Sequence, residues 1–206
     1  MISRPIGQSG IEASAIALGT WAIGGWLWGG TDEAQSIAAI RASLDAGITL
    51  IDTAPAYGMG YAEELVGKAI AGRRDEVILA TKCALVWHTD RGTYHIEQNG
   101  HRLHRYAGAD SIRYEVEQSL KRLQVDTIDI LQTHWQDDTT PIEETMTALL
   151  QLKAEGKIRA IGASNVTLPH IQAYSAVGPL DAIQNKYSMM DRGIEAEILP
   201  YCRENN

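Results

Sequence analysis

Short apolar runs rich in β-branched residues alternate along this chain with longer segments whose apolar residues recur at helical spacing. The runs have the length of buried strands, and the longer segments form one apolar face each. Strands that alternate with helices pair in parallel, because each helix returns the chain to the starting end of the sheet. We count six strand–helix pairs after a small N-terminal hairpin. The pattern predicts an α/β fold built on a parallel sheet, with no linker or low-complexity tract.

The predicted strands cover residues 15–20, 47–52, 77–81, 128–133, 158–163 and 180–183. Thr31, Asp110 and Thr140 are good N-caps for the helices that follow the first, third and fourth strands. The other predicted helices cover residues 62–71, 168–176 and 194–203. Residues 83–108 break this rhythm, and we expect a long polar loop that forms a flap on the substrate side.

Five successive strands each end in an ionisable or amide side chain. These side chains are Asp52, Lys82, His134, the pair Ser164 and Asn165, and Gln184. A tyrosine, Tyr57, follows Asp52 after a proline turn. A single Lys or His at a strand end is commonly a solvated cap, but in a barrel of parallel strands all these ends converge on one face. The pattern therefore predicts an active site there.

The chemistry of these residues favours proton donation to an oxygen. A tyrosine acts as a general acid near neutrality when a neighbouring ammonium lowers its pKa, and Lys82 is the candidate. Asp52 would hold that lysine charged, and His134 would add a neutral hydrogen bond to a substrate carbonyl. Tyr57 would then protonate an oxygen that becomes negative as hydride reaches carbon.

Other side chains predicted near this face are candidates for binding a cofactor, a substrate or a metal. Asn165 and Gln184 offer the donors and acceptors that suit the carboxamide of a nicotinamide ring. Trp21 and Trp26, on a glycine-rich loop, and Trp87, in the long loop, are candidates for the wall of a substrate pocket, although tryptophans that only pack on helices would give the same pattern. His101 and His104 have no Cys or carboxylate at matching spacing, so we expect no metal.

The net charge, the apolar runs and the cysteine content limit which partners and which cellular location we expect for this protein. The formal net charge of −8 argues against nucleic acid and against an anionic membrane surface as partners. No apolar run is long enough to span a membrane, and the first residues lack the apolar core of a signal peptide. The two cysteines, Cys83 and Cys202, form no motif. A reduced, cytoplasmic compartment is the expected location.

Several motifs together resemble the aldo-keto reductases. They are Leu18-Gly-Thr-Trp, Asp52-Thr-Ala-Pro-Ala-Tyr57-Gly, Thr81-Lys82, Asp126-Thr-Ile-Asp129-Ile-Leu-Gln-Thr-His134-Trp, Gly156-Lys-Ile-Arg-Ala-Ile-Gly-Ala-Ser164-Asn165 and Gln184-Asn-Lys-Tyr187-Ser. The resemblance implies a (β/α)8 TIM-type barrel that uses NADPH or NADH without a Rossmann domain. It assigns the family's catalytic tetrad to Asp52, Tyr57, Lys82 and His134. It assigns carboxamide binding to Ser164, Asn165 and Gln184.

This resemblance leads to an expected function and an alternative. We expect residues 1–206 to form a single aldo-keto reductase barrel domain that lacks the last two βα units, with open edges and a weak grip on the cofactor. The expected activity is NAD(P)H-dependent reduction of an aldehyde or ketone. A non-catalytic barrel used as an interaction module, as in the potassium-channel β-subunits of this family, is the alternative. A Schiff-base aldolase would need a desolvated Lys82, which the adjacent Asp52 disfavours.

Overall fold

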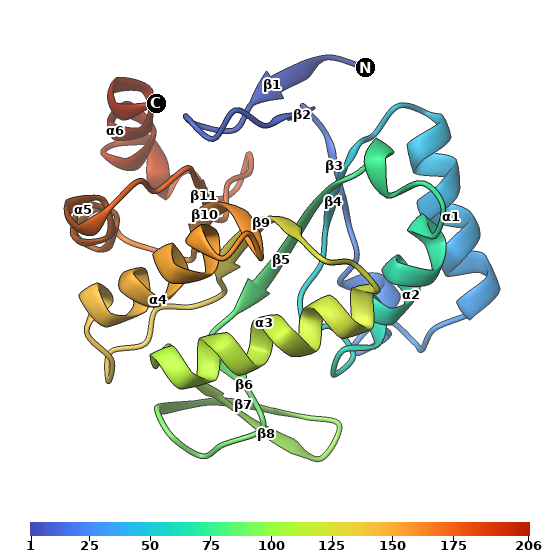
Figure 1. The fold of residues 1–206 in the computed structure, drawn as a ribbon, viewed down its shortest axis with the longest axis horizontal. Helices are drawn as coiled ribbons and strands as arrows, with labels where there is room; N and C mark the ends of the chain where they lie inside the picture. Colours follow the sequence, from blue (N-terminus) through green and yellow to red (C-terminus); the bar gives the residue numbers. More distant parts are fainter.

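A six-stranded parallel sheet forms the centre of the computed structural model, which describes residues 1–206 (Figure 1). Its strands, in chain order, are β3 (Ala17–Gly19), β4 (Leu50–Asp52), β5 (Ile78–Cys83), β9 (Ile128–Thr133), β10 (Ile158–Ser164) and β11 (Ala182–Gln184). The strands also lie in this order in space, and every neighbouring pair is parallel. The six predicted strands are thus confirmed, with the first, second and last shorter than predicted.

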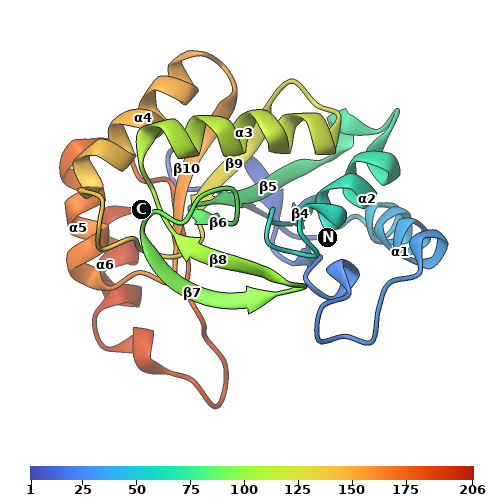
Figure 2. The same cartoon turned by 90° about the horizontal axis from the view of Figure 1, so that it is seen from below.

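Helices cover the outer side of the curved sheet (Figure 2). They are α1 (Glu33–Asp45), α2 (Tyr61–Ile70), α3 (Ala109–Leu123), α4 (Ile142–Ala154), α5 (Leu168–Val177) and α6 (Ile198–Asn205). Their buried apolar residues and the outward side chains of the strands, such as Leu79 and Leu131, form one core of 26 residues. Because this core occupies the outer face, the inner face of the sheet is left for the site.

The inner face changes from apolar to polar along the strands. Near the starting ends, Ala80, Ile130 and Ala160 pack together with Ile11. Two residues further along β5 and β9, on the same face of each strand, stand Lys82 and Gln132, which are register partners. Polar side chains on this face are therefore gathered at the carboxyl ends of the strands.

An N-terminal hairpin covers the end of the sheet at which the parallel strands start. It consists of β1 (Ser3–Pro5) and β2 (Glu12–Ser14), which pair antiparallel. Its residue Ile11 is buried against the inner apolar layer. The predicted N-terminal hairpin is thus confirmed, and it covers the starting ends of the strands (Figure 1).

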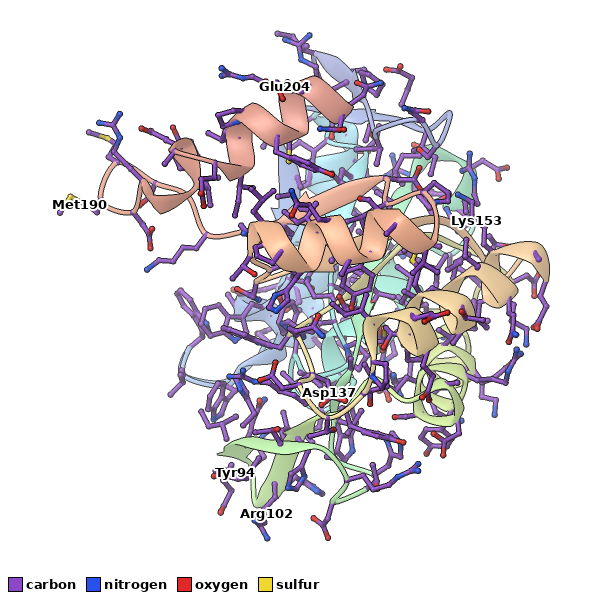
Figure 3. The ribbon with its side chains drawn as sticks, turned by 90° about the vertical axis from the view of Figure 1, so that its left-hand side faces the viewer. Tyr94, Arg102, Asp137, Lys153, Met190 and Glu204 are labelled. Carbon is purple, nitrogen blue, oxygen red and sulfur yellow. The ribbon has the colours of Figure 1, made fainter.

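Residues 83–108 are not the loop that the sequence suggested. They form a three-stranded antiparallel sheet of β6 (Leu85–Val86), β7 (Thr93–Gln98) and β8 (His101–Arg105) beyond the carboxyl end of β5. Asn99 and Gly100 connect β7 to β8, and both have positive φ angles, 50° and 77°. An Asn-Gly pair is a strong hairpin signal that should have predicted this turn. Tyr94 and Arg102 point away from the body of the molecule (Figure 3).

Three helix starts and the last helix differ from the prediction. Asp32, not Thr31, caps α1 by accepting from the Gln35 amide at 2.9 Å, because the Thr31 hydroxyl is used on the Ile23 carbonyl. Asp110 lies inside the first turn of α3, whose N-cap is Gly108. Thr140 forms no capping box; Pro141 is the N-cap of α4. Helix α6 is preceded by a separate 3-10 turn, Gly193–Glu195.

Strands β3 and β11 are the two edges of the sheet. Beyond β11, Met189 and Met190 are 94% and 95% exposed, and Met190 extends away from the body of the molecule (Figure 3). Unpaired strand edges can accept strands from other chains. None of the helices has the length and apolar character needed to cross a bilayer.

Candidate active site

Lys82 is the hub of the site at the carboxyl end of the sheet. Its Nζ donates to both carboxylate oxygens of Asp52 at 2.8 Å, to the Thr53 carbonyl at 3.0 Å and to the Tyr57 hydroxyl at 3.2 Å. The lysine is 2% exposed. A buried ammonium needs such a set of acceptors, because an unpaired one would lose its hydration without compensation. The geometry thus brings Asp52, Lys82 and Tyr57 together.

Two glycines place Tyr57 at this point. Gly58 has φ of 66°, and a Cβ there would lie 2.5 Å from the carbonyl oxygen of Gly24. A Cβ on Gly24 would lie 2.7 Å from the Tyr57 carbonyl carbon. Only glycine tolerates both the left-handed backbone and the close approach. The glycines therefore let the tryptophan loop after β3 pack directly on the Tyr57 backbone.

The Tyr57 phenol is arranged as a proton donor. Because Lys82 donates to its oxygen, the phenol hydrogen is directed elsewhere, and Tyr57 lines the adjacent pocket. The lowered pKa expected from the sequence is not found in this structure. Burial raises the pKa of Tyr57 above its ordinary value, and although the Lys82 charge opposes this, the Asp52 carboxylate adds to the increase. The phenol therefore holds its proton at neutral pH.

His134 faces Tyr57 across the site. The two rings meet edge to face with centroids 5.7 Å apart. Burial lowers the pKa of His134 well below its ordinary value, and the charges of Lys82 and His95 lower it further. This agrees with the neutral imidazole that we expected. A neutral ring can donate one hydrogen bond to a carbonyl oxygen that lies between it and Tyr57.

The three residues assigned to carboxamide binding lie at adjacent strand ends. Ser164 is the register partner of Gln184, and the Ser164 hydroxyl lies 3.5 Å from the Gln184 side-chain oxygen. Asn165 has φ of 55°, and its Nδ2 donates to the His134 carbonyl at 2.8 Å. Its Oδ1 thus remains an acceptor, and the Gln184 amide remains a donor. One acceptor and one donor match the two ends of a carboxamide, so these residues fit a nicotinamide ring.

A pocket of about 270 Å³ opens beside Tyr57 and His134. Its remaining lining residues are Trp21, Trp26, Ala56, Leu85, His95, Ile96, Gln98, Leu103, Trp135 and Asn165. Two of the three tryptophans named from the sequence, Trp21 and Trp26, line this pocket. Trp87 does not line the pocket, because β6 ends at Val86 and Trp87 packs instead against the small cluster of Ala56, Leu85 and Leu103.

Sequence reasoning missed most of the wall that the small sheet supplies. Leu85, Ile96 and Leu103 come from its three strands. Trp135 follows His134 directly, and its place after a strand end is a signal that could have predicted it. His101 and His104 do not form a metal pair, since His101 is exposed, His104 is buried, and residues three apart on a strand face opposite sides.

A buried carboxyl group supports the chain where β5 leaves the sheet. Glu115 of α3 accepts from the Ala84 amide with both oxygens, at 3.0 and 3.1 Å. Ala84 has φ of 68°, a strained value for a residue with a Cβ. Burial raises the pKa of Glu115 to about 8. Glu115 therefore fixes the turn that joins the Lys82 strand to the small sheet.

This raised pKa predicts a pH-dependent stability. The folded protein holds the Glu115 proton more tightly than the unfolded chain, so stability is lost as pH rises from the ordinary glutamate range toward 8. Urea unfolding measures the free energy of unfolding at pH 5 and at pH 8. Between these two pH values, this free energy should fall by on the order of 3 kcal/mol less in Glu115→Gln than in the unmodified protein. Glu117→Gln, on the same helix but half-exposed, should keep the original loss. Equal losses in all three proteins would contradict the role of burial.

Known proteins are similar to this chain in sequence and in structure. The model of the Aldo/keto reductase family matches residues 15–206. The chain belongs to this family. Among curated relatives, Aldo-keto reductase YhdN of Bacillus subtilis is 54% identical over 97% of this chain and 58% of its own length. The NADH-specific methylglyoxal reductase of Escherichia coli is 46% identical over 98% of this chain and 63% of its own.

Solved structures agree with the family assignment. The glycerol dehydrogenase AKR11B4 from Gluconobacter oxydans superposes with a TM-score of 0.87 at 44% identity, covering 99% of this chain and 60% of that one. An aldo/keto reductase from Klebsiella pneumoniae in complex with NADP and acetate gives 0.80 at 35% identity, covering 99% and 65%. The chain thus spans less than two thirds of each of these proteins. Its six strand–helix units are a part of the family's (β/α)8 barrel.

Proposed function

We propose that this protein reduces an aldehyde or ketone to an alcohol with NADPH or NADH, and that Tyr57 supplies the proton. The observation that carries the proposal is the contact of buried Lys82 with both the Asp52 carboxylate and the Tyr57 hydroxyl. A phenol held in this way donates its hydrogen into the pocket while an ammonium stabilises the phenolate that remains. Relatives named as a methylglyoxal reductase and a glycerol dehydrogenase support the reaction class.

Each residue has one task in this proposal. Tyr57 donates its proton to the carbonyl oxygen, and His134 holds that oxygen by a hydrogen bond from its neutral ring. Lys82 stabilises the negative charge that appears on the Tyr57 oxygen. Asp52 forms an ion pair with Lys82 and fixes its direction. The pocket walls, including Trp21 and Trp26, exclude water from the reacting oxygen and so strengthen these interactions.

Ser164, Asn165 and Gln184 are proposed to hold the carboxamide of the nicotinamide cofactor. The acceptor that Asn165 leaves free and the amide donor of Gln184 support this assignment. The cofactor, when bound, supplies hydride to the carbonyl carbon. A fixed carboxamide would orient the ring with respect to Tyr57, because Asn165 and Tyr57 line the same pocket.

The two alternatives are less well supported. A Schiff-base lysine must be deprotonated, yet Lys82 is surrounded by the Asp52 carboxylate, the Thr53 carbonyl and the Tyr57 hydroxyl. A non-catalytic interaction module would not need the four polar side chains to be assembled beside a pocket. It remains distinguishable by experiment, since such a module would bind cofactor without turnover.

The decisive experiment follows cofactor oxidation at 340 nm with propanal and analyses the product. We expect loss of NADPH or NADH and formation of propan-1-ol in equal amounts, each dependent on both substrates. Quenching of tryptophan fluorescence by cofactor without any propan-1-ol would support the interaction module instead. Trapping of the protein by borohydride with propanal but without nicotinamide would support a Schiff base on Lys82.

A further inference from the structure

A β-bulge brings a histidine into the pocket wall. Tyr94 pairs with His104 and Ile96 pairs with Leu103, so His95 is an extra residue in β7 with no partner in β8. Successive residues of a regular strand face opposite sides, but His95 and Ile96 both line the pocket. Bulges redirect side chains in this way next to active sites. The β-bulge therefore turns the His95 ring into the pocket wall, where it is the only polar ring that the small sheet supplies.

Arg105 of the neighbouring strand sets the hydrogen-bonding state of this ring. The Arg105 Nε–H donates to His95 Nδ1 at 2.9 Å. An arginine cannot accept, so Nδ1 carries a lone pair and the neutral ring has its proton on Nε2. Trp135 holds the arrangement, because the Arg105 guanidinium lies 4.8 Å from the Trp135 ring centroid and the His95 ring 5.0 Å from it.

The ring is also kept neutral. Burial lowers the pKa of His95, and the adjacent Arg105 charge lowers it further. The Nε2–H of His95 donates to no group of the protein, and His95 and His134 line the same pocket. The pocket otherwise offers mainly apolar walls to the part of a substrate that lies away from Tyr57. A neutral donor that has no protein partner and stands among apolar side chains is suited to a neutral acceptor.

From this geometry we propose that His95 determines substrate specificity by donating its Nε2–H to a second, uncharged oxygen of the substrate, a hydroxyl or carbonyl close to the carbonyl that is reduced. Arg105 is the positioning residue that selects the donating tautomer. The preferred substrates are then small hydroxycarbonyl or dicarbonyl compounds. Simple carbonyl compounds of the same size leave the His95 donor unsatisfied in the wall, which costs binding energy. This inference rests on the proposed carbonyl reduction.

The test compares two ketones that differ only by a hydroxyl in place of a methyl group, 1-hydroxypropan-2-one and butan-2-one. With cofactor saturating, the purified protein should prefer the hydroxyketone in kcat/KM by about ten- to hundredfold, the effect expected of one buried hydrogen bond. In His95→Phe this ratio should fall to less than about threefold. The matched control is His101→Phe, on the same sheet but exposed and outside the pocket, which should keep the original ratio.

A second measurement separates the role of Arg105 from a structural one. Nitrogen-15 NMR should show His95 with an unprotonated Nδ1 and a protonated Nε2, and Arg105→Met should lose this signature together with part of the preference. Two outcomes overturn the inference and leave the proposed function standing: equal use of both ketones by the unmodified protein, or an unchanged ratio in His95→Phe. A proton on Nδ1 of His95 also overturns it. Failure to reduce any carbonyl compound overturns both proposals.

Discussion

Replacing Tyr57 with phenylalanine should lower kcat/KM for carbonyl reduction by about a hundred- to ten-thousandfold, the range for loss of a general acid. The substitution removes only the hydroxyl, which accepts from Lys82 and faces the pocket. Since no contact to the carboxamide site changes, the dissociation constant of the cofactor should stay within a few-fold. Stopped-flow measurement of the hydride step with propanal, together with fluorescence titration of cofactor, checks both expectations.

Tyr114→Phe is a matched control for this variant. Tyr114 lies half-exposed on α3 and its ring contacts His88, away from the pocket. The same loss of one hydroxyl there should leave reduction unchanged. If Tyr57→Phe kept near-normal turnover in a rate-limiting hydride step, Tyr57 could not be the proton donor.

Lys82→Met should lower reduction by a similar factor and should also destabilise the fold. The Lys82 charge lowers the pKa of Tyr57, so its removal raises that pKa further and makes proton loss from the phenol harder. The acid form of Tyr57 drives reduction, so the rate falls as pH rises through its pKa, and in Lys82→Met this fall should move to higher pH. Asp52 is left without its cation, which costs about 3–5 kcal/mol for a buried pair.

The pH profile of kcat and urea unfolding test this second variant. Lys68→Met provides the comparison, because Lys68 pairs with Glu33 at 2.7 Å on the surface, where both side chains are more than 40% exposed. An exposed pair contributes little, so this variant should change neither stability nor rate appreciably. If kcat of Lys82→Met fell at the same alkaline pH as kcat of the unmodified protein, Lys82 would not act through the Tyr57 phenol.

The fold and the convergence of Asp52, Lys82 and His134 could be predicted from sequence because both follow from periodicity. Apolar runs separated by amphipathic helices require parallel strands, and parallel strands have all their carboxyl ends on one side. Asp52, Lys82 and His134 each end such a run. Their convergence therefore needed no knowledge of packing, and the structure supplied only the distances.

Other features depend on contacts between segments that are distant in sequence. The pKa of Tyr57 depends on how much protein covers the phenol, and here burial outweighs the nearby ammonium. Likewise, nothing local distinguishes Glu115 from Glu117, the half-exposed glutamate of the same helix; only its contact with the Ala84 amide across 31 positions shows its role.

Residues 83–108 contain one feature that local sequence predicts and one that depends on how the strands pair. The Asn99–Gly100 turn is a local signal and was available in the sequence. The bulge at His95 was not, because the extra residue is defined only by the register of β7 on β8. Sequence by itself thus determined which residues end the parallel strands, since side-chain alternation and strand direction are local properties. Tertiary structure alone decided which side chains face the pocket and in what protonation state, because register, burial and neighbouring charges exist only after the segments have packed together.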